Sequence, residues 1–194
     1  MNISEIKTLH QKHAPSPEVF ESVFSHCQIV CEIAEELISK SDIQCDVELV
    51  KSGALIHDIG VYKLTDKEGV EDRKNYIRHG IEGYKILKDE GFPESLCRIA
   101  ERHTGVGISR DQIFANNLPL PPKDYIAETI EEKLVMYADK FHSKNPDNFN
   151  SFESYRTFVR RHGEESVKKF EELAILFGKP DIEAFSRKYN QPII

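Results

Sequence analysis

The sequence has few cysteines, no apolar run long enough to span a bilayer, and no excess of positive charge. Its four cysteines form no Cys-x-x-Cys motif, and three of them lie in periodic apolar patterns. This pattern predicts small core residues in a reducing compartment, without disulfides. No stretch approaches the ~20 consecutive apolar residues that cross a membrane. Residues 1–13 also lack the apolar region of a signal peptide. We therefore expect a cytoplasmic protein with no membrane partner.

The charge balance argues against one class of partner. The sequence has 26 Lys and Arg against 33 Asp and Glu, which gives a formal net charge of -7. A protein dedicated to wrapping a nucleic-acid duplex needs a positive face, so nucleic acid is not an expected partner. An acidic protein can still bind phosphate at one place, where metal ions or a few cationic side chains reverse the local field.

The length and composition predict one domain. A chain of 194 residues that is 39% hydrophobic and 30% charged can bury one sizeable core without disulfide or metal staples. Neither a repeat nor a low-complexity tract interrupts it. We place the core of a single domain, residues 1–194, in residues 17–145 and expect helices within 150–190 to pack on it. The oligomeric state is left open by the sequence.

Apolar residues recur at three- and four-residue spacing through most of the chain, the pattern of amphipathic helices, which predicts an all-α bundle. The longest such pattern runs from Pro17 to Ser39. Further helices are predicted at 46–60, 77–89, 93–103, 127–142, 152–162, 164–177 and 182–189. The segments 61–76 and 106–125 lack the pattern and are predicted as loops. The second contains three prolines and is either a lid or a plain connector.

Residues 55–60 read Leu-Ile-His-Asp-Ile-Gly, an apolar run that ends in a histidine and an aspartate side by side. Imidazole and carboxylate groups are both metal ligands, and the glycine fits a helix that ends at this point. Other polar residues also interrupt apolar faces or stand at helix ends: His26, His79, His103 and Asp139. Each of them alone is explained as a core residue with its hydrogen bonds made or as a surface residue. Together with His57 and Asp58 they give four imidazoles and two carboxylates on five helices, which a bundle core could bring to one point.

This combination resembles the HD-domain superfamily of metal-dependent phosphohydrolases. The resemblance covers roughly residues 26–142 and is carried by Ser-His-Cys at 25–27, Leu-Ile-His-Asp-Ile-Gly at 55–60 and Tyr-Ala-Asp-Lys at 137–140. It implies that one metal ion is held by His26, His57, Asp58 and Asp139. Two further histidines bind a second ion in dinuclear members, with the aspartate of the pair bridging both ions. Here these would be His79 and His103, with Asp58 as the bridge.

The motifs also distinguish branches of the superfamily. His103-Thr104-Gly105 resembles the branch that includes bacterial hydrolases of symmetrical dinucleoside tetraphosphates. Many bimetallic relatives have a lysine directly after His-Asp-Ile-Gly, whereas Val61 stands there in this chain and the nearest lysine is Lys63. The Gly-Tyr-Pro tripeptide of the cyclic-dinucleotide phosphodiesterases is absent from the sequence. Both departures count against an assignment to that subfamily.

The candidate ligands define the expected chemistry. Mixed imidazole and carboxylate ligation suits one or two ions of Mn, Fe, Co, Ni or Zn. Such an ion lowers the pKa of a bound water, which makes hydroxide available to attack phosphorus, and a second ion would hold the phosphoryl oxygens. We therefore expect a phosphohydrolase or phosphodiesterase that cleaves a phosphoester or phosphoanhydride bond. Its substrate would be small and phosphorylated, with a nucleotide favoured, including a dinucleoside polyphosphate.

Further side chains are candidates for roles around the metal ligands. Asp58 could also orient the attacking water, and His142, three residues beyond Asp139, could act as an acid. Cations near the ligands could neutralise phosphate charge, although each is also explained as part of a solvated helix surface. These cations are Lys63, Arg78, Arg102, Arg110 and Lys140, of which Arg102 and Lys140 adjoin ligands.

Two other functions fit the same residues. One is a catalytically silent domain that binds metal and nucleotide and regulates a partner. The complete set of six candidate ligands disfavours it, because a degenerate domain is expected to lose ligands. The other is a structural helical module whose histidines are satisfied core residues. It predicts no stoichiometric metal and mainly a loss of stability when His57 or Asp58 is replaced.

Overall fold

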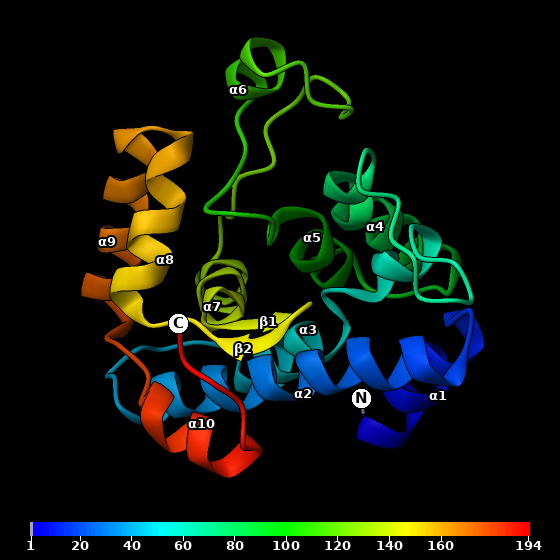
Figure 1. Cartoon of the computed structure of the whole chain (residues 1–194), viewed down its shortest axis with the longest axis horizontal. Helices are drawn as coiled ribbons and strands as arrows, with labels where there is room; N and C mark the ends of the chain where they lie inside the picture. Colours follow the sequence, from blue (N-terminus) through cyan, green and yellow to red (C-terminus); the bar gives the residue numbers. More distant parts are fainter. Residues whose placement is uncertain (1) are drawn as a thin grey trace.

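The computed structural model describes residues 2–194 as a bundle of helices with one small β-hairpin (Figure 1). The helices are α1 (Ile3–His13), α2 (Pro17–Ser39), α3 (Val47–Ile56), α4 (His79–Asp89), α5 (Glu94–Arg102), α6 (Arg110–Ala115), α7 (Ile130–Ala138), α8 (Phe152–Val159), α9 (Glu164–Phe177) and α10 (Ile182–Tyr189). Short 3-10 turns and strands complete it: η1 (Ile59–Lys63), η2 (Tyr76–Arg78), η3 (Asp139–Phe141), η4 (Arg160–His162), β1 (His142–Lys144) and β2 (Asp147–Phe149). The predicted all-α class is confirmed.

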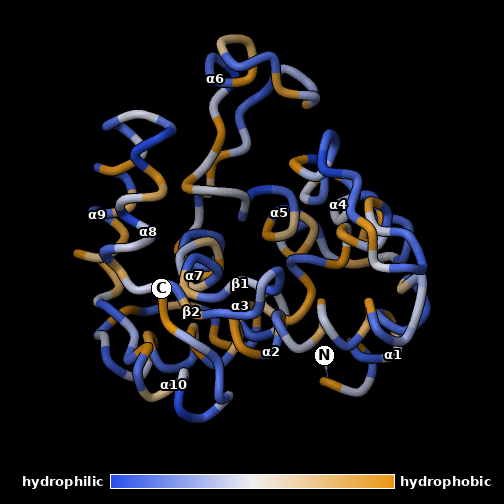
Figure 2. Tube along the Cα trace, in the orientation of Figure 1, coloured by the Kyte–Doolittle hydropathy of each residue, from blue (hydrophilic) through white to orange (hydrophobic). Residues whose placement is uncertain are grey.

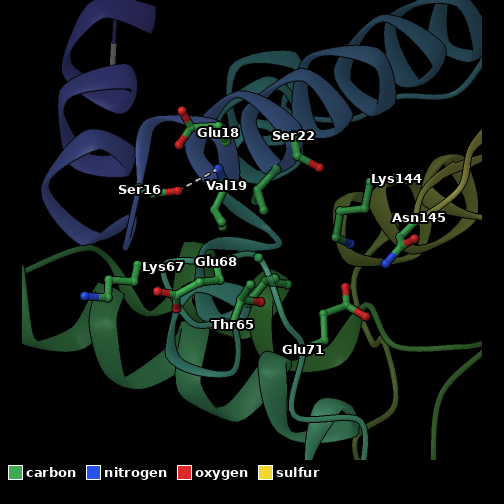
Figure 3. A pocket seen from close by; sticks show the side chains of 13 residues that line it. Ser16, Glu18, Val19, Ser22, Thr65, Lys67, Glu68, Glu71, Lys144 and Asn145 are labelled. Carbon is green, nitrogen blue, oxygen red and sulfur yellow. Dashed lines mark hydrogen bonds between the residues drawn. The ribbon is translucent and has the colours of Figure 1, made fainter.

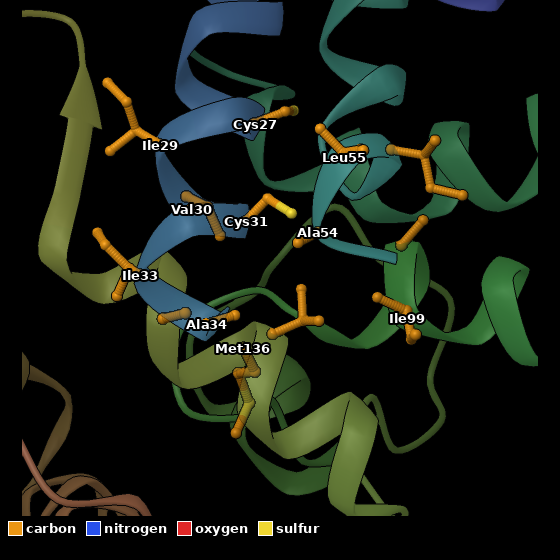
Figure 4. Close-up of a cluster of buried hydrophobic side chains, with 14 of the residues drawn as sticks. Cys27, Ile29, Val30, Cys31, Ile33, Ala34, Ala54, Leu55, Ile99 and Met136 are labelled. Carbon is orange, nitrogen blue, oxygen red and sulfur yellow. The ribbon is translucent and has the colours of Figure 1, made fainter. Parts of the chain in front are cut away.

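The core is built around α2. Its N-terminus is capped by the Ser16 hydroxyl, which accepts a hydrogen bond from the backbone N–H of Val19, and Pro17 stands in the first turn. The apolar face of α2 packs on α3 and α7, and Figure 4 shows Cys27 and Ala34 of α2 in a cluster with side chains of α3, α5 and α7. Hydrophobic residues gather where these helices meet (Figure 2). The cysteines are free, and three of them are buried, as the sequence predicted.

Gly60 allows a close approach between two elements, which the sequence did not reveal. The helix predicted to end at Gly60 ends at Ile56, and Gly60 lies within η1. A Cβ atom at this position would lie 1.9 Å from the backbone oxygen of His79 and 2.2 Å from the backbone nitrogen of Gly83. Glycine is therefore required because η1 rests directly against the start of α4.

Several other predicted boundaries are wrong. The segment 106–125, predicted as a loop, contains α6, whose N-terminus has a capping box between Ser109 and Gln112. The helix predicted over 127–142 ends at Ala138, and the chain continues through η3 into the β1–β2 hairpin. Helix α1 was not predicted. These elements are short or lie at the surface, so a long apolar period does not mark them.

The last third of the chain packs on the bundle. Tyr137 of α7 contacts Phe170 and Phe177 of α9, with ring centroids 5.6 and 5.8 Å apart, and its hydroxyl donates a hydrogen bond to the Gly178 carbonyl. The C-terminal residues pair with β2, since the Phe149 N–H donates to the Pro192 carbonyl at 2.8 Å. Within residues 2–194, no helix has the length and apolarity needed to cross a membrane.

Candidate metal centre

The structure brings together all six candidate metal ligands. They come from the middle of α2, the end of α3, the start of α4, the end of α5 and the end of α7: His26, His57, Asp58, His79, His103 and Asp139. The four histidines and Asp58 are at most 7% exposed, and the Asp139 side chain is 16% exposed. Unpaired polar groups at this depth are costly, so these side chains need partners.

The first half of the cluster contains His26, His57 and Asp139. Asp139 Oδ1 lies 3.0 Å from His26 Nε2 and 3.4 Å from His57 Nε2. Asp58 Oδ2 faces the same two rings, at 3.5 Å from His26 Nε2 and 3.8 Å from His57 Nε2. We call these four groups the first half-site. The ligand atoms of His26, His57 and Asp139 lie within 4.8 Å of one another, close enough to share one ion, and those of His57, Asp58 and His103 form a second such group.

The second half of the cluster faces the other oxygen of Asp58. Asp58 Oδ1 lies 3.4 Å from His103 Nε2 and 3.7 Å from His79 Nε2. The two imidazole Nε2 atoms are 2.9 Å apart. We call these three groups the second half-site. Asp58 therefore presents one oxygen to each half-site, which is the arrangement of a bridging carboxylate.

Backbone carbonyls fix the orientation of three of the imidazoles. Nδ1 of His57, His79 and His103 lies 2.7 to 2.8 Å from the carbonyl oxygen three residues earlier in each case. A carbonyl oxygen only accepts hydrogen bonds, so each Nδ1 carries the proton. In a neutral ring each Nε2 then has a lone pair that points into the cluster, which is the state in which an imidazole binds metal. Burial alone would lower the pKa of His57, but the adjacent Asp58 carboxylate raises it well above its ordinary value, so a metal ion bound there would displace the Nε2 proton.

The short distances between the ring nitrogens fit a cation. Nε2 of His79 is 2.9 Å from Nε2 of His103, and Nε2 of His57 is 3.3 Å from Nε2 of His26; in neutral rings with protonated Nδ1 atoms these nitrogens are acceptors facing each other. Two acceptors at such distances repel unless a positive ion lies between them. Burial lowers the pKa of His26 to about 3 and that of His79 to about 4, which keeps both rings neutral near pH 7. Four imidazoles and two carboxylates suit a divalent transition metal.

His142, predicted as an acid, lies against His26. Its Nδ1 is 2.8 Å from His26 Nδ1, and its Nε2 is 2.9 Å from Oε1 of Gln191. An amide oxygen only accepts, so His142 Nε2 donates to Gln191, and His142 Nδ1 accepts the proton of His26 Nδ1. These two hydrogen bonds leave the lone pair of His26 Nε2 free to face the first half-site. The contacts favour a positioning role for His142, and proton donation to a substrate stays a prediction.

Two buried lysines contact the carboxylates. Lys140 Nζ lies 2.7 Å from Asp139 Oδ2 and donates to the His103 carbonyl at 2.9 Å, so it ties the two half-sites together. Lys144 Nζ lies 2.5 Å from Asp58 Oδ2. Burial alone would lower the pKa of Lys144, but the adjacent Asp58 carboxylate raises it well above its ordinary value. Lys144 therefore carries a full charge beside the cluster.

Lys144 was not recognisable from the sequence as a residue of the site. The residue stands two positions after His142 in β1, and alternate strand residues share a face, so Lys144 and His142 face the cluster together. The strand has only three residues and gives no alternation that could be recognised. The Asn-Pro-Asp turn signal at 145–147 was the one local indication of a hairpin.

The other predicted phosphate-binding cations lie outside this cluster. Lys63 is exposed on η1. The Arg78 guanidinium donates to a backbone carbonyl and to a glutamate, and Arg102 bonds a carbonyl and two glutamates. Arg110 lies in α6, with its guanidinium over the Phe114 ring. None of these four side chains lines the cavity at the cluster.

That cavity has a volume of about 330 Å³, at the lower end of the ~300–1,000 Å³ of small-ligand pockets. Its walls include the histidines of the second half-site, both lysines, and the aromatic residues Tyr76, Tyr155 and Phe158. A neighbouring cavity of about 400 Å³ shares Glu71, Lys144 and Asn145 with it. Figure 3 shows Lys144 and Asn145 on one side of this second cavity and Ser16 and Lys67 on the other. Lys144 thus stands between the two cavities.

Comparison with protein families matches residues 23–144 to the HD domain. An uncharacterized protein of Methanocaldococcus jannaschii is 45% identical over 122 residues, which is 61% of this chain and 65% of that protein. A tRNA (cytidine(56)-2'-O)-methyltransferase of Picrophilus torridus is 42% identical over 117 residues, 60% of this chain and 30% of the relative. The match thus spans just under two thirds of the first relative and less than a third of the methyltransferase.

Two solved structures have a similar fold. The HD domain of the Listeria monocytogenes phosphodiesterase PgpH superposes with a TM-score of 0.56 at 16% identity, covering 95% of this chain and 98% of that one. The same domain in complex with cyclic-di-AMP gives a TM-score of 0.55 at 17% identity, covering 96% and 98% of the two chains. At these identities the likeness shows the fold alone.

Proposed function

The chain belongs to the HD-domain family, and from this premise we propose that it is a metal-dependent phosphohydrolase that cleaves a phosphoester or phosphoanhydride bond. The observation that carries the proposal is the arrangement around Asp58. One buried carboxylate presents its two oxygens to two pairs of imidazoles, whose Nε2 atoms lie close together around it. A purely structural cluster of core histidines would satisfy these nitrogens with hydrogen-bond donors.

The first half-site would hold one ion and the second half-site another, with Asp58 bridging them. When bound, such ions supply Lewis acidity toward phosphoryl oxygens and lower the pKa of water toward neutrality. The protein contributes orientation and charge. Backbone carbonyls hold the imidazoles, Lys140 holds Asp139 in place, and Lys144 brings a positive charge to the wall of the cavity where phosphate oxygens would lie.

We favour a nucleotide or another small phosphorylated metabolite as the substrate. The cavity volume fits a ligand of this size. The cyclic-di-AMP complex of the PgpH domain is an example of a nucleotide bound by a protein of this fold. The cations at the cavity, Lys140 and Lys144, give phosphate a place to bind in a chain whose net charge is negative.

The test is a phosphate-release screen on the full chain. Mono-, di- and polyphosphorylated nucleotides and cyclic and linear dinucleotides are offered with Mn²⁺ or Fe²⁺, and products are separated chromatographically. His57→Ala and Asp58→Ala should lower turnover by more than about 100-fold while the far-ultraviolet circular dichroism spectrum is retained. His13→Ala is the matched control, because His13 pairs with Glu90 away from the cavity. Absence of turnover with every metal and substrate would refute the proposal.

A catalytically silent regulatory domain is a second candidate, favoured by one observation. In the Picrophilus methyltransferase the matching stretch makes up only 30% of the protein, so there the matched stretch is one part of a longer chain. Such a domain would bind metal and nucleotide without turnover. The screen separates the two candidates when it is combined with a binding measurement, since only the enzyme releases product.

A further inference from the structure

Two aromatic rings form one wall of the cavity beside the metal cluster. Tyr155 and Phe158 come from α8, which lies beyond the residues matched to the family. Their ring centroids are 5.5 Å apart, and Tyr155 is anchored on the buried Phe170 at 4.9 Å. Phe158 is nevertheless 46% exposed while its side chain lines the cavity. The position therefore presents a large apolar ring to the mouth of the cavity.

A guanidinium group accompanies this ring. The Arg161 guanidinium carbon lies 3.6 Å from the centre of the Phe158 ring, in cation–π contact. The neighbouring Arg156 and Arg160 are paired with glutamates, whereas Arg161 has no carboxylate within 4.0 Å among residues 2–194. We call Tyr155, Phe158 and Arg161 the aromatic ledge. It combines flat stacking surfaces with a positive charge that no acidic side chain neutralises.

We propose that the aromatic ledge binds the base of a nucleotide whose phosphate lies at the metal cluster. Aromatic rings and guanidinium planes are the surfaces on which proteins stack nucleobases. Tyr155 and Phe158 of the ledge line the same cavity as the cluster, and Arg161 lies against the Phe158 ring beside it. One ligand with a flat apolar part and an anionic part would therefore contact both the ledge and the cluster. The placement of the phosphate rests on the proposed function, while the base contact rests on the ledge itself.

The test compares two ligands that differ only in the base. The non-hydrolysable methylenephosphonate analogues of AMP and ribose 5-phosphate are titrated calorimetrically into the Mn²⁺-loaded protein. The wild type should bind the AMP analogue about tenfold more tightly, which is the typical contribution of one stacked base. Phe158→Ala should lower the affinity for the AMP analogue about tenfold and leave that for the ribose analogue unchanged. Phe158→Trp should keep the preference, because it restores a stacking surface.

The chain offers a matched control. Phe114 in α6 is 61% exposed, and the Arg110 guanidinium lies 5.6 Å from its ring, but neither lines the cavity. Phe114→Ala should leave both affinities unchanged. The proposal would be overturned if the wild type bound the two analogues equally or did not bind the AMP analogue. It would also be overturned if Phe158→Ala lowered the affinity for both analogues equally. The titration measures binding and needs no turnover, so a catalytically silent domain would still bind the AMP analogue more tightly than the ribose analogue. An active enzyme that binds both analogues equally would contradict the role of the aromatic ledge and leave the proposed function standing.

Discussion

Replacing Lys144 by methionine tests how the cluster is stabilised without metal. The Lys144 side chain is 13% exposed and that of Asp58 is 3% exposed, so Lys144→Met leaves a carboxylate charge buried without its cation. Breaking a buried pair in this way costs roughly 3–5 kcal/mol. We take the lower end, about 3 kcal/mol, because the lysine is partly open to solvent. The unfolding entropy of a chain of this size is about 0.4 kcal/mol/K, so the melting temperature should fall by about 7 °C.

Metal should reverse much of this loss. An ion in either half-site brings positive charge to Asp58, so Mn²⁺ should raise the melting temperature of Lys144→Met more than that of the wild type. Thermal unfolding is followed by circular dichroism with EDTA and with Mn²⁺. Lys63→Met, at an exposed position of η1, should change stability by no more than about 0.5 kcal/mol. A Lys144→Met variant that melts at the wild-type temperature in EDTA would contradict the stabilising role of this pair. So would an equal shift of both melting temperatures by Mn²⁺.

Three further predictions concern other parts of the structure. Gly60→Ala places a Cβ atom 1.9 Å from the His79 backbone oxygen, so the start of α4 must shift, and elemental analysis should show loss of about one ion per chain. His142→Ala removes the acceptor of the His26 Nδ1 proton, so metal affinity, measured by calorimetry, should fall about 10–100-fold. An unchanged metal affinity would exclude the positioning role of His142. Burial lowers the pKa of His10 to about 4 from the 6.5 expected in the unfolded chain. The unfolded state therefore takes up the proton first, and stability falls as the pH drops from about 6.5 to 4. In urea unfolding series at several pH values, His10→Gln should reduce the dependence of the unfolding free energy on pH by the equivalent of about one proton. An unchanged dependence on pH would contradict the lowered pKa of His10.

Much of the fold and of the cluster could be predicted because the signals are local. The helix from Pro17 to Ser39 carries its own apolar period, and the structure gives it the same bounds. The six ligand candidates were recognisable because each interrupts an apolar face or stands at a helix end. A polar residue at such a position must find a partner, and several of them in one bundle can serve one another.

The rest depends on contacts between distant segments. The reason for Gly60 lies in the backbone of α4, and the sequence near Gly60 contains no sign of that approach. Lys144 reaches Asp58 through a hairpin of two three-residue strands, which is too short to give a period. His142 is tied to Gln191, 49 positions later, so its contacts depend on where the C-terminal segment lies.

The number of metal ions per chain tests the central claim most directly. The wild type and Asp58→Ala are loaded with Mn²⁺, dialysed against metal-free buffer and subjected to elemental analysis. The geometry around Asp58 predicts two ions per chain in the wild type and a loss of bound metal in Asp58→Ala with the fold retained. A wild type without stoichiometric metal, or an Asp58→Ala variant that keeps both ions, would contradict the account.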